Sequence, residues 1–421
     1  MLGFARQSWL VLVLLGIAVG LLSHASPALW QPLPITGIDV PGLSELDRLM
    51  ARFMIQHHVV GGALAVAKDG RLIYARGFGF SDKETNQSVQ PDSLFRIASV
   101  SKPITAVAAL KLYEEGKLDL NAKAFSLLSD LQPPPGASPD PRLQEITVRQ
   151  LLQHASGLVR SGFGASRENI EAAHALGVTP PASSETIVRY GLTRPLDFAP
   201  GTRAGYSTLG YVALGRVLER VQERKYEEYV KQRVLAPAGV SRMQIGETLP
   251  HERISGEVRY YDAPGAPLAP SVYPPHSLLP RPYVFYLKGV ESGGGWIASS
   301  IDLLRFVTTI DGQRPPALLK PETVALMTAR PDRPDAVNAP VYFGMGWVIR
   351  QTNLGVEWQH NGSLIGARSL LVRRADGVAW AVLFNAEPSS DSMLAELDRE
   401  ISQILDRVKE WPTHDLFSQY P

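Results

Sequence analysis

The spacing of apolar residues changes twice along the chain. Residues 62–67 and 71–75 are short apolar runs joined by a tight Asp-Gly turn, and residues 368–373 and 378–385 repeat that arrangement near the other end. Two such runs with a tight turn between them predict a β-hairpin. The pattern therefore predicts one hairpin close to each end of the chain.

Elsewhere, apolar residues recur at the spacing of helices that bury one face. Ser44-Glu45-Leu46-Asp47 matches a capping box, so a helix is expected to begin there. The run Ala106 to Tyr113 consists mostly of good helix formers. Further helices are predicted over residues 146–154, 209–220, 226–234 and 391–409.

Strands at both ends and helices in the middle predict an α+β fold. In this fold, an antiparallel sheet flanked by helices is built from both chain ends, and a mainly helical subdomain is inserted. The sheet-bearing parts are expected at about 43–120 and 284–410, and the helical insertion at about 121–283. Within the insertion, Pro250 to Pro282 holds eight prolines and is expected to form a long surface loop.

The first 25 residues have the pattern of an export signal. An apolar run over residues 9–22 follows Arg6, and Ser23-His24-Ala25 places small residues at a plausible cleavage site. This run suits a signal-peptide core better than a membrane span, which needs about 20 residues. We therefore expect an exported protein, periplasmic or secreted, with an inner-membrane anchor over residues 9–22 as the alternative.

The expected organisation of the whole chain follows from these segments. Residues 1–25 are a signal peptide or N-terminal membrane anchor, 26–42 a linker, 43–410 the folded domain and 411–421 a C-terminal tail.

Composition narrows the chemistry. Of 421 residues, 45% are apolar and 20% charged, and the net charge is +1. These values are typical of a globular protein and give no reason to expect nucleic acid as a partner. The absence of cysteine excludes disulfides, thiolate catalysis and zinc–thiolate sites. His57 and His58 point different ways on a helix end, so no metal site is expected there, and no cofactor is expected either.

A serine and a lysine lie one helical turn apart within Phe95 to Thr105. Residues i and i+3 share a helix face, so Ser99 Oγ and Lys102 Nζ can meet. The pair offers a nucleophile and an amine able to take its proton, provided that burial lowers the pKa of the amine. The helix N-terminus adds N–H groups where an oxyanion could form. The spacing alone also fits an N-cap serine beside a solvated lysine, so other parts of the chain must decide.

Two distant motifs could complete such a site. Tyr206 lies in a Gly-rich loop just before a predicted helix, which can aim a phenol inward. His360-Asn361-Gly362-Ser363 is expected to open a strand that continues toward Leu370, where Gly362 would let a substrate approach the backbone. Taken singly, a tyrosine or histidine in these positions is more often structural.

In this order the motifs resemble those of the penicillin-recognising serine hydrolases, which include class C β-lactamases, DD-peptidases, D-aminopeptidases and β-lactamase-like esterases. The resemblance runs from about Leu43 to Asp406 and is nearest to β-lactamase-like hydrolases with a His-x-Gly third motif. Three more segments look like family markers: residues 151–158 (LLQHASGL), residues 293–299 (GGGWIAS) with Asp302-Leu303, and residues 344–347 (GMGW). The resemblance implies the β-lactamase/DD-peptidase fold and hydrolysis through an acyl-enzyme.

The resemblance also implies catalytic roles. Ser99 would attack a carbonyl carbon, while Lys102 and Tyr206 would share the general-base and general-acid work. The backbone N–H groups of Ser99 and Ser363 would form the oxyanion hole. Water would then hydrolyse the acyl-enzyme, without a cofactor.

Substrate contacts are implied at four positions, two of which depart from the common family pattern. His360 would stand where many relatives have lysine, either donating to a substrate carboxylate or holding the catalytic tyrosine. Thr208, Asn361 and Gly362 would bind the substrate. Thr208 replaces the asparagine of the usual Tyr-x-Asn motif, and a hydroxyl offers one donor where an amide offers two. Both departures argue against efficient antibiotic hydrolysis.

The implied substrate is a small molecule or peptide with a scissile amide or ester bond. Among related activities, a peptidase or amidase is expected first, a carboxylesterase next and a weak β-lactamase last. A penicillin-recognising receptor that binds or is acylated without turnover is the alternative from another functional class. A vestigial site is disfavoured because Ser99, Lys102 and Tyr206 are all present, and an α/β-hydrolase is disfavoured because no Gly-x-Ser-x-Gly elbow occurs.

Overall fold

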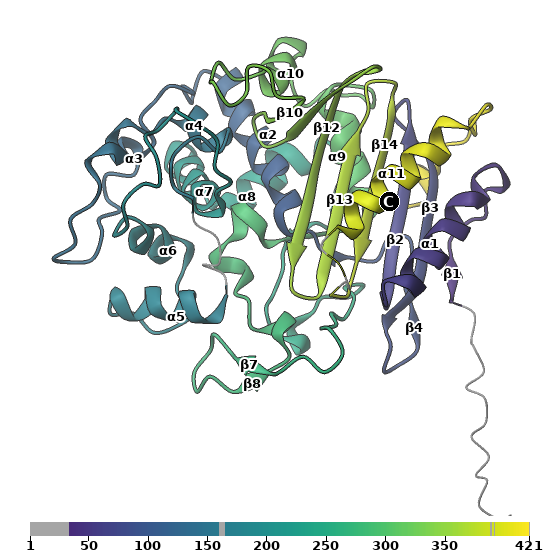
Figure 1. Ribbon diagram of the computed structural model, residues 1–421, viewed down its shortest axis with the longest axis horizontal. Coiled ribbons are helices and arrows are strands. Elements are labelled where there is room, and N and C mark those ends of the chain that lie inside the picture. The colour runs from purple at the N-terminus through teal and green to yellow at the C-terminus, as the bar shows by residue number, and fades with distance from the viewer. Residues whose placement is uncertain (1–32, 160–164, 388–389, 391, 421) are drawn as a thin grey trace, which may run out of the picture. The chain divides into compact units, whose positions relative to one another are not determined.

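A large antiparallel sheet runs through the protein, for which the computed structural model describes residues 33–159, 165–387, 390 and 392–420. Its strand order is β1-β3-β2-β14-β13-β12-β11-β10, with the short β4 paired to β3 (Figure 1). The N-terminal strands are β1 (Ile35–Thr36), β2 (Gly61–Lys68), β3 (Arg71–Asp82) and β4 (Gln87–Ser88). The C-terminal strands are β10 (Val341–Phe343), β11 (Val348–Thr352), β12 (Gly355–Leu364), β13 (Ala367–Arg373) and β14 (Val378–Phe384).

Both predicted hairpins are confirmed, and they meet in the middle of the sheet. Strand β2 of the first hairpin pairs with β14 of the second, in a register that sets Val66 opposite Trp380. The sheet is therefore built from both chain ends, as the distribution of strand-like segments predicted.

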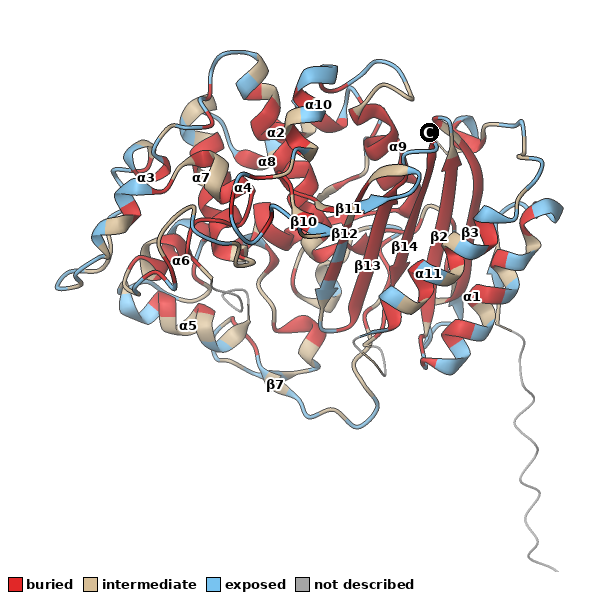
Figure 2. Cartoon of the chain, turned by 45° about the horizontal axis from the view of Figure 1, so that its top comes forward, coloured by how far each residue is buried: buried red, intermediate tan, exposed pale blue. Residues whose placement is uncertain are grey.

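Helices cover both faces of this sheet. Helices α1 (Ser44–Gln56) and α11 (Met393–Asp406) lie on one face, with buried residues toward the sheet and exposed residues outward (Figure 2). Alternation along β14 sends Phe384 to that face, where its ring lies 6.3 Å from the ring of Phe53 in α1. The alternate residues Ala379, Ala381 and Leu383 join the core on the other face, which α9 (Ser300–Ile310) covers. Because both faces are covered, every residue of β14 is buried.

A mainly helical subdomain lies between the two halves of the sheet in sequence. It contains α3 (Ala124–Leu127), α4 (Val148–Leu152), α5 (Ser166–Ala175), α6 (Ser184–Gly191), α7 (Thr208–Gln222) and α8 (Tyr226–Val230). Helix α2 (Ser101–Glu114) packs against α7, and α10 (Pro321–Thr328) also contacts α2. The α+β fold class is confirmed, as are the predicted helices, with boundaries shifted by a few residues.

The expected capping box at the start of α1 does not form. A 3₁₀ turn (Pro41–Leu43) leads directly into the helix, so Ser44 already has helical backbone angles. A residue in that conformation cannot serve as N-cap, and the Ser44 hydroxyl instead accepts a hydrogen bond from Arg48 at 3.3 Å. The helix itself forms because Leu46, Leu49 and Phe53 are buried against the sheet.

The proline-rich stretch is tied to the strand that precedes Ser99. Its one pair of strands is β7 (Ala269–Pro270) with β8 (Leu278–Leu279), two residues each, and isolated bridges join Glu257 to Leu94 and Tyr261 to Ala386. A separate three-stranded sheet has the order β5 (Phe95–Arg96), β9 (Trp296–Ala298), β6 (Gln244–Ile245). Its strands β6 and β9 flank the proline-rich stretch in sequence. The buried Arg96 guanidinium lies 4.3 Å from the ring centre of Tyr260 and donates to the carbonyls of Thr248 and Pro282. These contacts anchor the loop close to the Ser99 segment.

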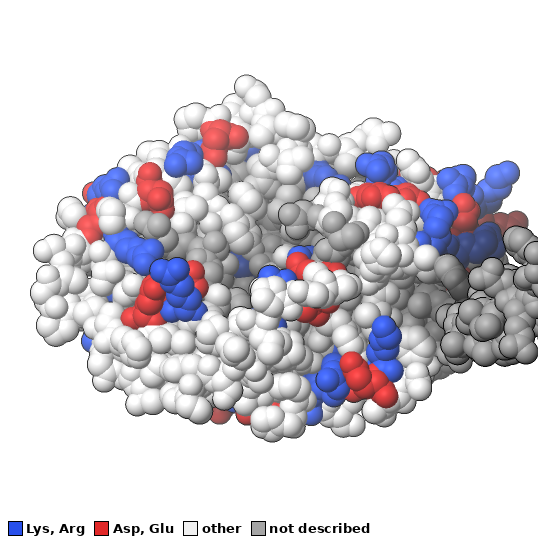
Figure 3. Space-filling model, turned by 60° about the horizontal axis from the view of Figure 1, so that its bottom comes forward, with Lys and Arg blue, Asp and Glu red and all other residues white. Residues whose placement is uncertain are grey.

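The C-terminal tail is partly buried in the folded domain. Leu416 and Phe417 of the C-terminal tail are buried, and Arg305 donates to the Phe417 carbonyl at 2.7 Å. The expected signal peptide or anchor lies outside the described residues, as do residues 26–32 of the expected linker. Within the described residues, no helix is both long enough and apolar enough to span a membrane. On the face shown in Figure 3, basic and acidic side chains lie in mixed clusters.

Candidate active site

Ser99 lies in a short 3₁₀ helix (Ala98–Val100) between β5 and α2. The regular α-helix begins at Ser101, so Ser99 lies in the 3₁₀ turn before the helix and not in its first turn. Ala98 has φ of 47°, a left-handed conformation that costs a non-glycine residue on the order of 1 kcal/mol and tends to occur at functional sites. Residues i and i+3 eclipse in a 3₁₀ turn, so Ser99 still faces Lys102.

The ammonium position of Lys102 lies in a closed polar pocket of three oxygen atoms. Lys102 Nζ is 3.1 Å from Ser99 Oγ, 2.6 Å from the Gly293 carbonyl oxygen and 3.5 Å from Thr208 Oγ1. The side chain is fully buried, and none of these partners is a carboxylate. Burial lowers the pKa of Lys102 to about 7. A neutral amine would donate to Gly293 and Thr208 and keep its lone pair for the Ser99 hydroxyl.

Tyr206 closes the site from the loop that precedes α7. Its ring centre lies 4.8 Å from Lys102 Nζ. Burial raises the pKa of the Tyr206 phenol, and its hydrogen bond with Ser99 offsets part of that rise. The phenol is therefore protonated at neutral pH, which makes it a proton donor rather than a resting base.

Thr208 and the Gly-rich segment make the floor of the lysine pocket. Ser207 is the N-cap of α7 and accepts from the Gly210 N–H at 2.8 Å, which leaves Thr208 as the first helical residue. A Cβ added to Gly293 would lie 3.0 Å from Thr208 Cγ2, so the glycine allows the two segments to meet. This contact brings the Gly293 carbonyl to Lys102.

His360 faces the site from β12, but not from the position predicted for it in the strand. The motif closes β12, which ends at Leu364, and a turn separates it from β13; it does not open a strand toward Leu370. The ring of His360 lies 6.2 Å from the ring of Tyr206. Its Nδ1 lies 2.7 Å from the Asn361 carbonyl, which can only accept, so Nδ1 carries the ring proton.

The protonation state of His360 follows from its surroundings. The side chain is buried, and burial together with the nearby Lys102 lowers the pKa of His360 to about 3. The imidazole is therefore neutral at physiological pH. Its Nε2 is an unprotonated acceptor without a hydrogen-bond partner among the described residues.

Gly362 brings the end of β12 against the turn that carries Ser99. A Cβ at this position would lie 2.3 Å from the Ile97 carbonyl oxygen and 3.1 Å from Ala98 Cβ. Only a glycine fits such an approach. Ser363 follows in the strand with its side chain exposed, so its backbone lies near the serine turn while its hydroxyl points elsewhere.

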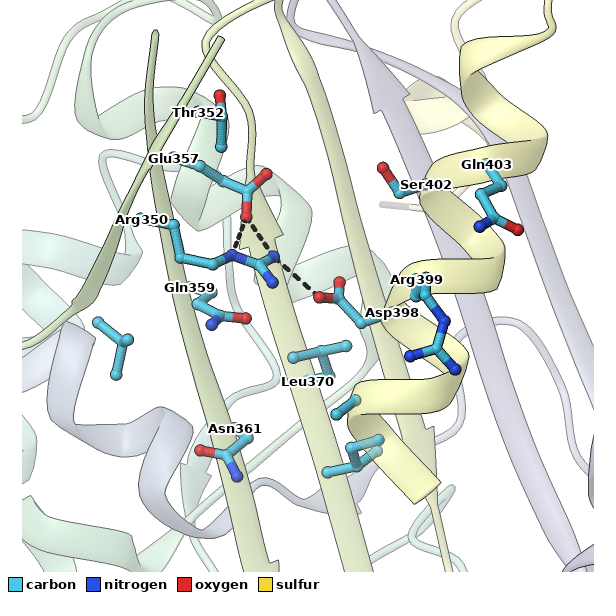
Figure 4. A pocket seen from close by; sticks show the side chains of 13 residues that line it. Arg350, Thr352, Glu357, Gln359, Asn361, Leu370, Asp398, Arg399, Ser402 and Gln403 are labelled. Carbon is cyan, nitrogen blue, oxygen red and sulfur yellow. Dashed lines mark hydrogen bonds and ion pairs between the residues drawn. The ribbon is translucent and has the colours of Figure 1, made fainter. Parts of the chain in front are cut away.

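The Asn361 side chain is not brought to the site. Alternation along β12 places it on the face opposite to His360, beside Gln359 and across from Leu370. There it lines a pocket of about 680 Å³ between the sheet and α11. Figure 4 shows Asn361 of β12 on the same face of the sheet as Arg350 of β11. Arg350 forms ion pairs with Glu357 and Asp398. Any contact of Asn361 with a substrate at Ser99 would have to come from its backbone.

One neighbour of Tyr206 received no role from sequence reasoning. His154, from the LLQHASGL segment, is buried with its ring 4.5 Å from that of Tyr206. The segment was recognised as a marker, but only the folded structure shows which side chain it contacts. In the part of the chain that is described, no three His, Asp or Glu side chains converge to form a possible metal site.

Comparisons with known proteins identify the family of the chain. A family model described as Beta-lactamase matches residues 46–403. Esterase EstB of Burkholderia gladioli is 29% identical over 371 residues, which cover 83% of this chain and 92% of the esterase. Penicillin-binding protein 4* of Bacillus subtilis is 26% identical over 333 residues, covering 76% of this chain and 67% of that protein.

Solved structures show the same fold. The octameric penicillin-binding protein homologue from Pyrococcus abyssi matches with a TM-score of 0.65 and 24% identity, covering 85% of this chain and 77% of that one. D-amino acid amidase from Ochrobactrum anthropi also reaches 0.65, with 23% identity over 87% of this chain and 97% of the amidase. The chain therefore belongs to the β-lactamase family of serine hydrolases.

Proposed function

We propose that this protein hydrolyses an ester or amide bond through an acyl-enzyme on Ser99. The observation that carries the proposal is the state of Lys102: a buried amine, 3.1 Å from the serine hydroxyl, without a carboxylate partner and with its pKa lowered to about 7. A structural lysine is normally solvated or paired, because burying an uncompensated charge is costly. An amine that is half neutral at pH 7 can instead act as a general base.

The proton path follows from the protonation states of Lys102 and Tyr206. Lys102 takes the proton of Ser99 as the serine oxygen bonds to the carbonyl carbon. The Tyr206 phenol then gives its proton to the leaving oxygen or nitrogen, and Lys102 returns the serine proton to Tyr206. One proton thus passes from the nucleophile to the leaving group, and water reverses the sequence to release the acid.

The oxyanion is assigned to the backbone N–H groups of Ser99 and Ser363. The close approach at Gly362, which sets β12 beside the Ser99 turn, supports this assignment. Two preorganised N–H donors stabilise a developing oxyanion without reorganisation, and removing one such donor typically costs about 10²–10³-fold in rate.

The neutral His360 favours substrates without a carboxylate beside the scissile bond. An imidazole with a pKa of about 3 cannot supply the positive charge that a peptide carboxylate or a β-lactam acid would need. The similarity to an esterase over 92% of that protein points the same way. We therefore place an esterase ahead of a peptidase or amidase, the reverse of the order expected from sequence.

A single set of rates tests the proposal. The protein without residues 1–25 is assayed with p-nitrophenyl esters, D-aminoacyl amides, a D-Ala-D-Ala peptide and nitrocefin. We expect the p-nitrophenyl esters to give the highest kcat/KM and Ser99→Ala to abolish turnover of all of them. Turnover that survives in Ser99→Ala refutes the mechanism, whereas higher rates on the peptide or nitrocefin refute only the substrate class.

The same experiment separates an enzyme from a receptor without turnover. A receptor would be acylated once by a fluorescent β-lactam or fluorophosphonate and would show no steady-state ester hydrolysis. We expect multiple turnovers on the ester, because the water that releases the acyl group can use the same Lys102 and Tyr206.

We also propose that the protein is exported. The apolar run 9–22 and the small residues at 23 and 25 support a protein that works in the periplasm or outside the cell, either released or anchored by that run. Cell fractionation with N-terminal sequencing of the mature protein tests it. Recovery of the intact chain in the cytoplasmic fraction would refute export.

A further inference from the structure

Tyr206 is the one proposed proton carrier that lies in a loop and not in a helix or strand. Its phenol must stay within reach of Ser99, yet the preceding segment has no regular secondary structure. The loop must therefore be fixed by contacts with another part of the chain. The contacts on both sides of the tyrosine lead to the same residue, His154.

His154 bonds to the backbone on either side of Tyr206. Its carbonyl oxygen accepts from the Gly205 N–H at 2.8 Å, and its Nδ1 accepts from the Ser207 N–H at 3.1 Å. Its ring lies 4.5 Å from the Tyr206 ring, at an interplanar angle of 34°. Phe343 and Tyr211 pack on the same imidazole, at 5.0 and 5.1 Å between ring centres.

The backbone of His154 is also unusual. Its φ is 54°, in the left-handed region, which is uncommon for residues other than glycine. This conformation ends α4 and turns the His154 carbonyl toward the Tyr206 loop. A non-glycine residue held in this conformation carries some backbone strain, and such residues cluster at functional sites.

We propose that His154 is a positioning residue for Tyr206: its carbonyl and Nδ1 hold the N–H groups that flank the tyrosine, and its ring packs against the phenol ring. The inference rests on the proposed function, in which Tyr206 carries protons. Because Nδ1 accepts a hydrogen bond, the ring proton is on Nε2 and the imidazole is neutral. Burial and the nearby Lys102 and His360 lower the pKa of His154 well below its usual value, so this tautomer persists at working pH.

Two variants separate the parts of this role. His154→Phe keeps a ring against Tyr206 and loses the acceptor for Ser207. His154→Asn loses the ring but offers an oxygen near the Nδ1 position and tolerates the left-handed backbone. We expect His154→Phe to lower kcat on a p-nitrophenyl ester by about 10–100-fold with KM changed less than threefold, because a misplacement of about 1 Å can cost 10²-fold. We expect His154→Asn to keep kcat within about fivefold of wild type.

A double-mutant cycle with Tyr206→Phe distinguishes positioning from a general structural effect. If His154 acts through the phenol, His154→Phe costs less than threefold once the phenol is gone. An unchanged cost in the Tyr206→Phe background overturns the inference, as does wild-type kcat in His154→Phe alone. Near-wild-type kcat in Tyr206→Phe contradicts the proposed role of Tyr206 itself, and the inference falls with it.

A measurement on the wild-type protein does not depend on whether a variant folds correctly. In ¹⁵N-histidine-labelled protein, we expect one imidazole with a bare Nδ1, a protonated Nε2 and no titration between pH 5 and 9, and we expect its signal to be missing in His154→Asn. Assignment of a protonated Nδ1 to His154 would overturn the inference.

Discussion

Replacing Lys102 with methionine should abolish catalysis and at the same time change the pH dependence of stability. In the folded protein, burial lowers the pKa of Lys102 from 10.5 to about 7. In the unfolded chain the amine returns to its ordinary value, so between these two pH values the unfolded state binds more protons. The free energy of unfolding of the wild type should therefore rise with pH across this window, relative to a variant without the amine.

The magnitude follows from the size of the shift. A difference of about 3.5 pKa units at about 1.36 kcal/mol each gives an upper bound of about 5 kcal/mol. This penalty is fully present below pH 7, declines between pH 7 and 10.5, and is absent above. Lys102→Met also leaves the Gly293 carbonyl without its 2.6 Å donor, a loss of about 1–3 kcal/mol that does not depend on pH.

Urea unfolding of both proteins at pH 6, 8 and 10 provides the assay. We expect Lys102→Met to be the more stable of the two at pH 6 and the less stable at pH 10, where the lost hydrogen bond to Gly293 outweighs the small remaining penalty. The other titrating groups are common to both proteins. Lys102 also lowers the pKa values of His154 and His360, but burial is the larger cause for both, so we expect both to stay neutral from pH 6 to 10 in either protein. A difference in free energy that stays constant from pH 6 to 10 would refute the conclusion that the lysine is buried with a lowered pKa.

The same site leads to three further predictions. In the wild type, kcat/KM for an ester should rise with pH to a plateau with a midpoint near 7, because the neutral form of Lys102 is the base; a flat profile from pH 5 to 9 would exclude it. Gly362→Ala should lower kcat at least about 10²-fold, since its Cβ would lie 2.3 Å from the Ile97 carbonyl, whereas Gly42→Ala, with open space around its Cβ, should retain full activity. Asn361→Ala should change kcat/KM less than about twofold, because the side chain lies on the far face of β12, and a large loss would place it in the site instead.

The fold was largely predictable because its strands come from hairpins with local signals. The Asp-Gly turns flanked by apolar runs identified β2 with β3 and β13 with β14 from residues adjacent in sequence. The pairing of β2 with β14 could not be derived in this way, since no local pattern connects residues more than 300 positions apart. The sequence predicted only that strands from both chain ends share one sheet; their order comes from the structure.

The sequence motifs predicted which residues would lie together at the candidate site, while their protonation states required the folded structure. The Ser99–Lys102 spacing required only helix geometry, and the structure places the two atoms 3.1 Å apart. The lowered pKa values of Lys102 and His360 depend on burial by segments distant in sequence, which the motifs do not encode.

Local errors had local causes. His360-Asn361-Gly362-Ser363 was placed at the start of a strand because the turn at Ile365-Gly366 has no strong sequence signal, whereas the motif in fact closes β12. With that motif inside a strand, alternation sends His360 toward Tyr206 and Asn361 away from it. A contiguous motif therefore contributes side chains to two faces of the sheet, and only one face bears the candidate active site.

Mass mapping of the acylated protein tests the central claim most directly. The protein is incubated with a fluorophosphonate or with a slowly hydrolysed p-nitrophenyl ester, quenched in acid and digested. If Ser99 is the nucleophile, we expect one modified peptide that contains Ser99 and carries the added acyl or phosphonyl mass. We expect no modified peptide from Ser99→Ala. Modification of a different residue, or labelling that persists in Ser99→Ala, would contradict it.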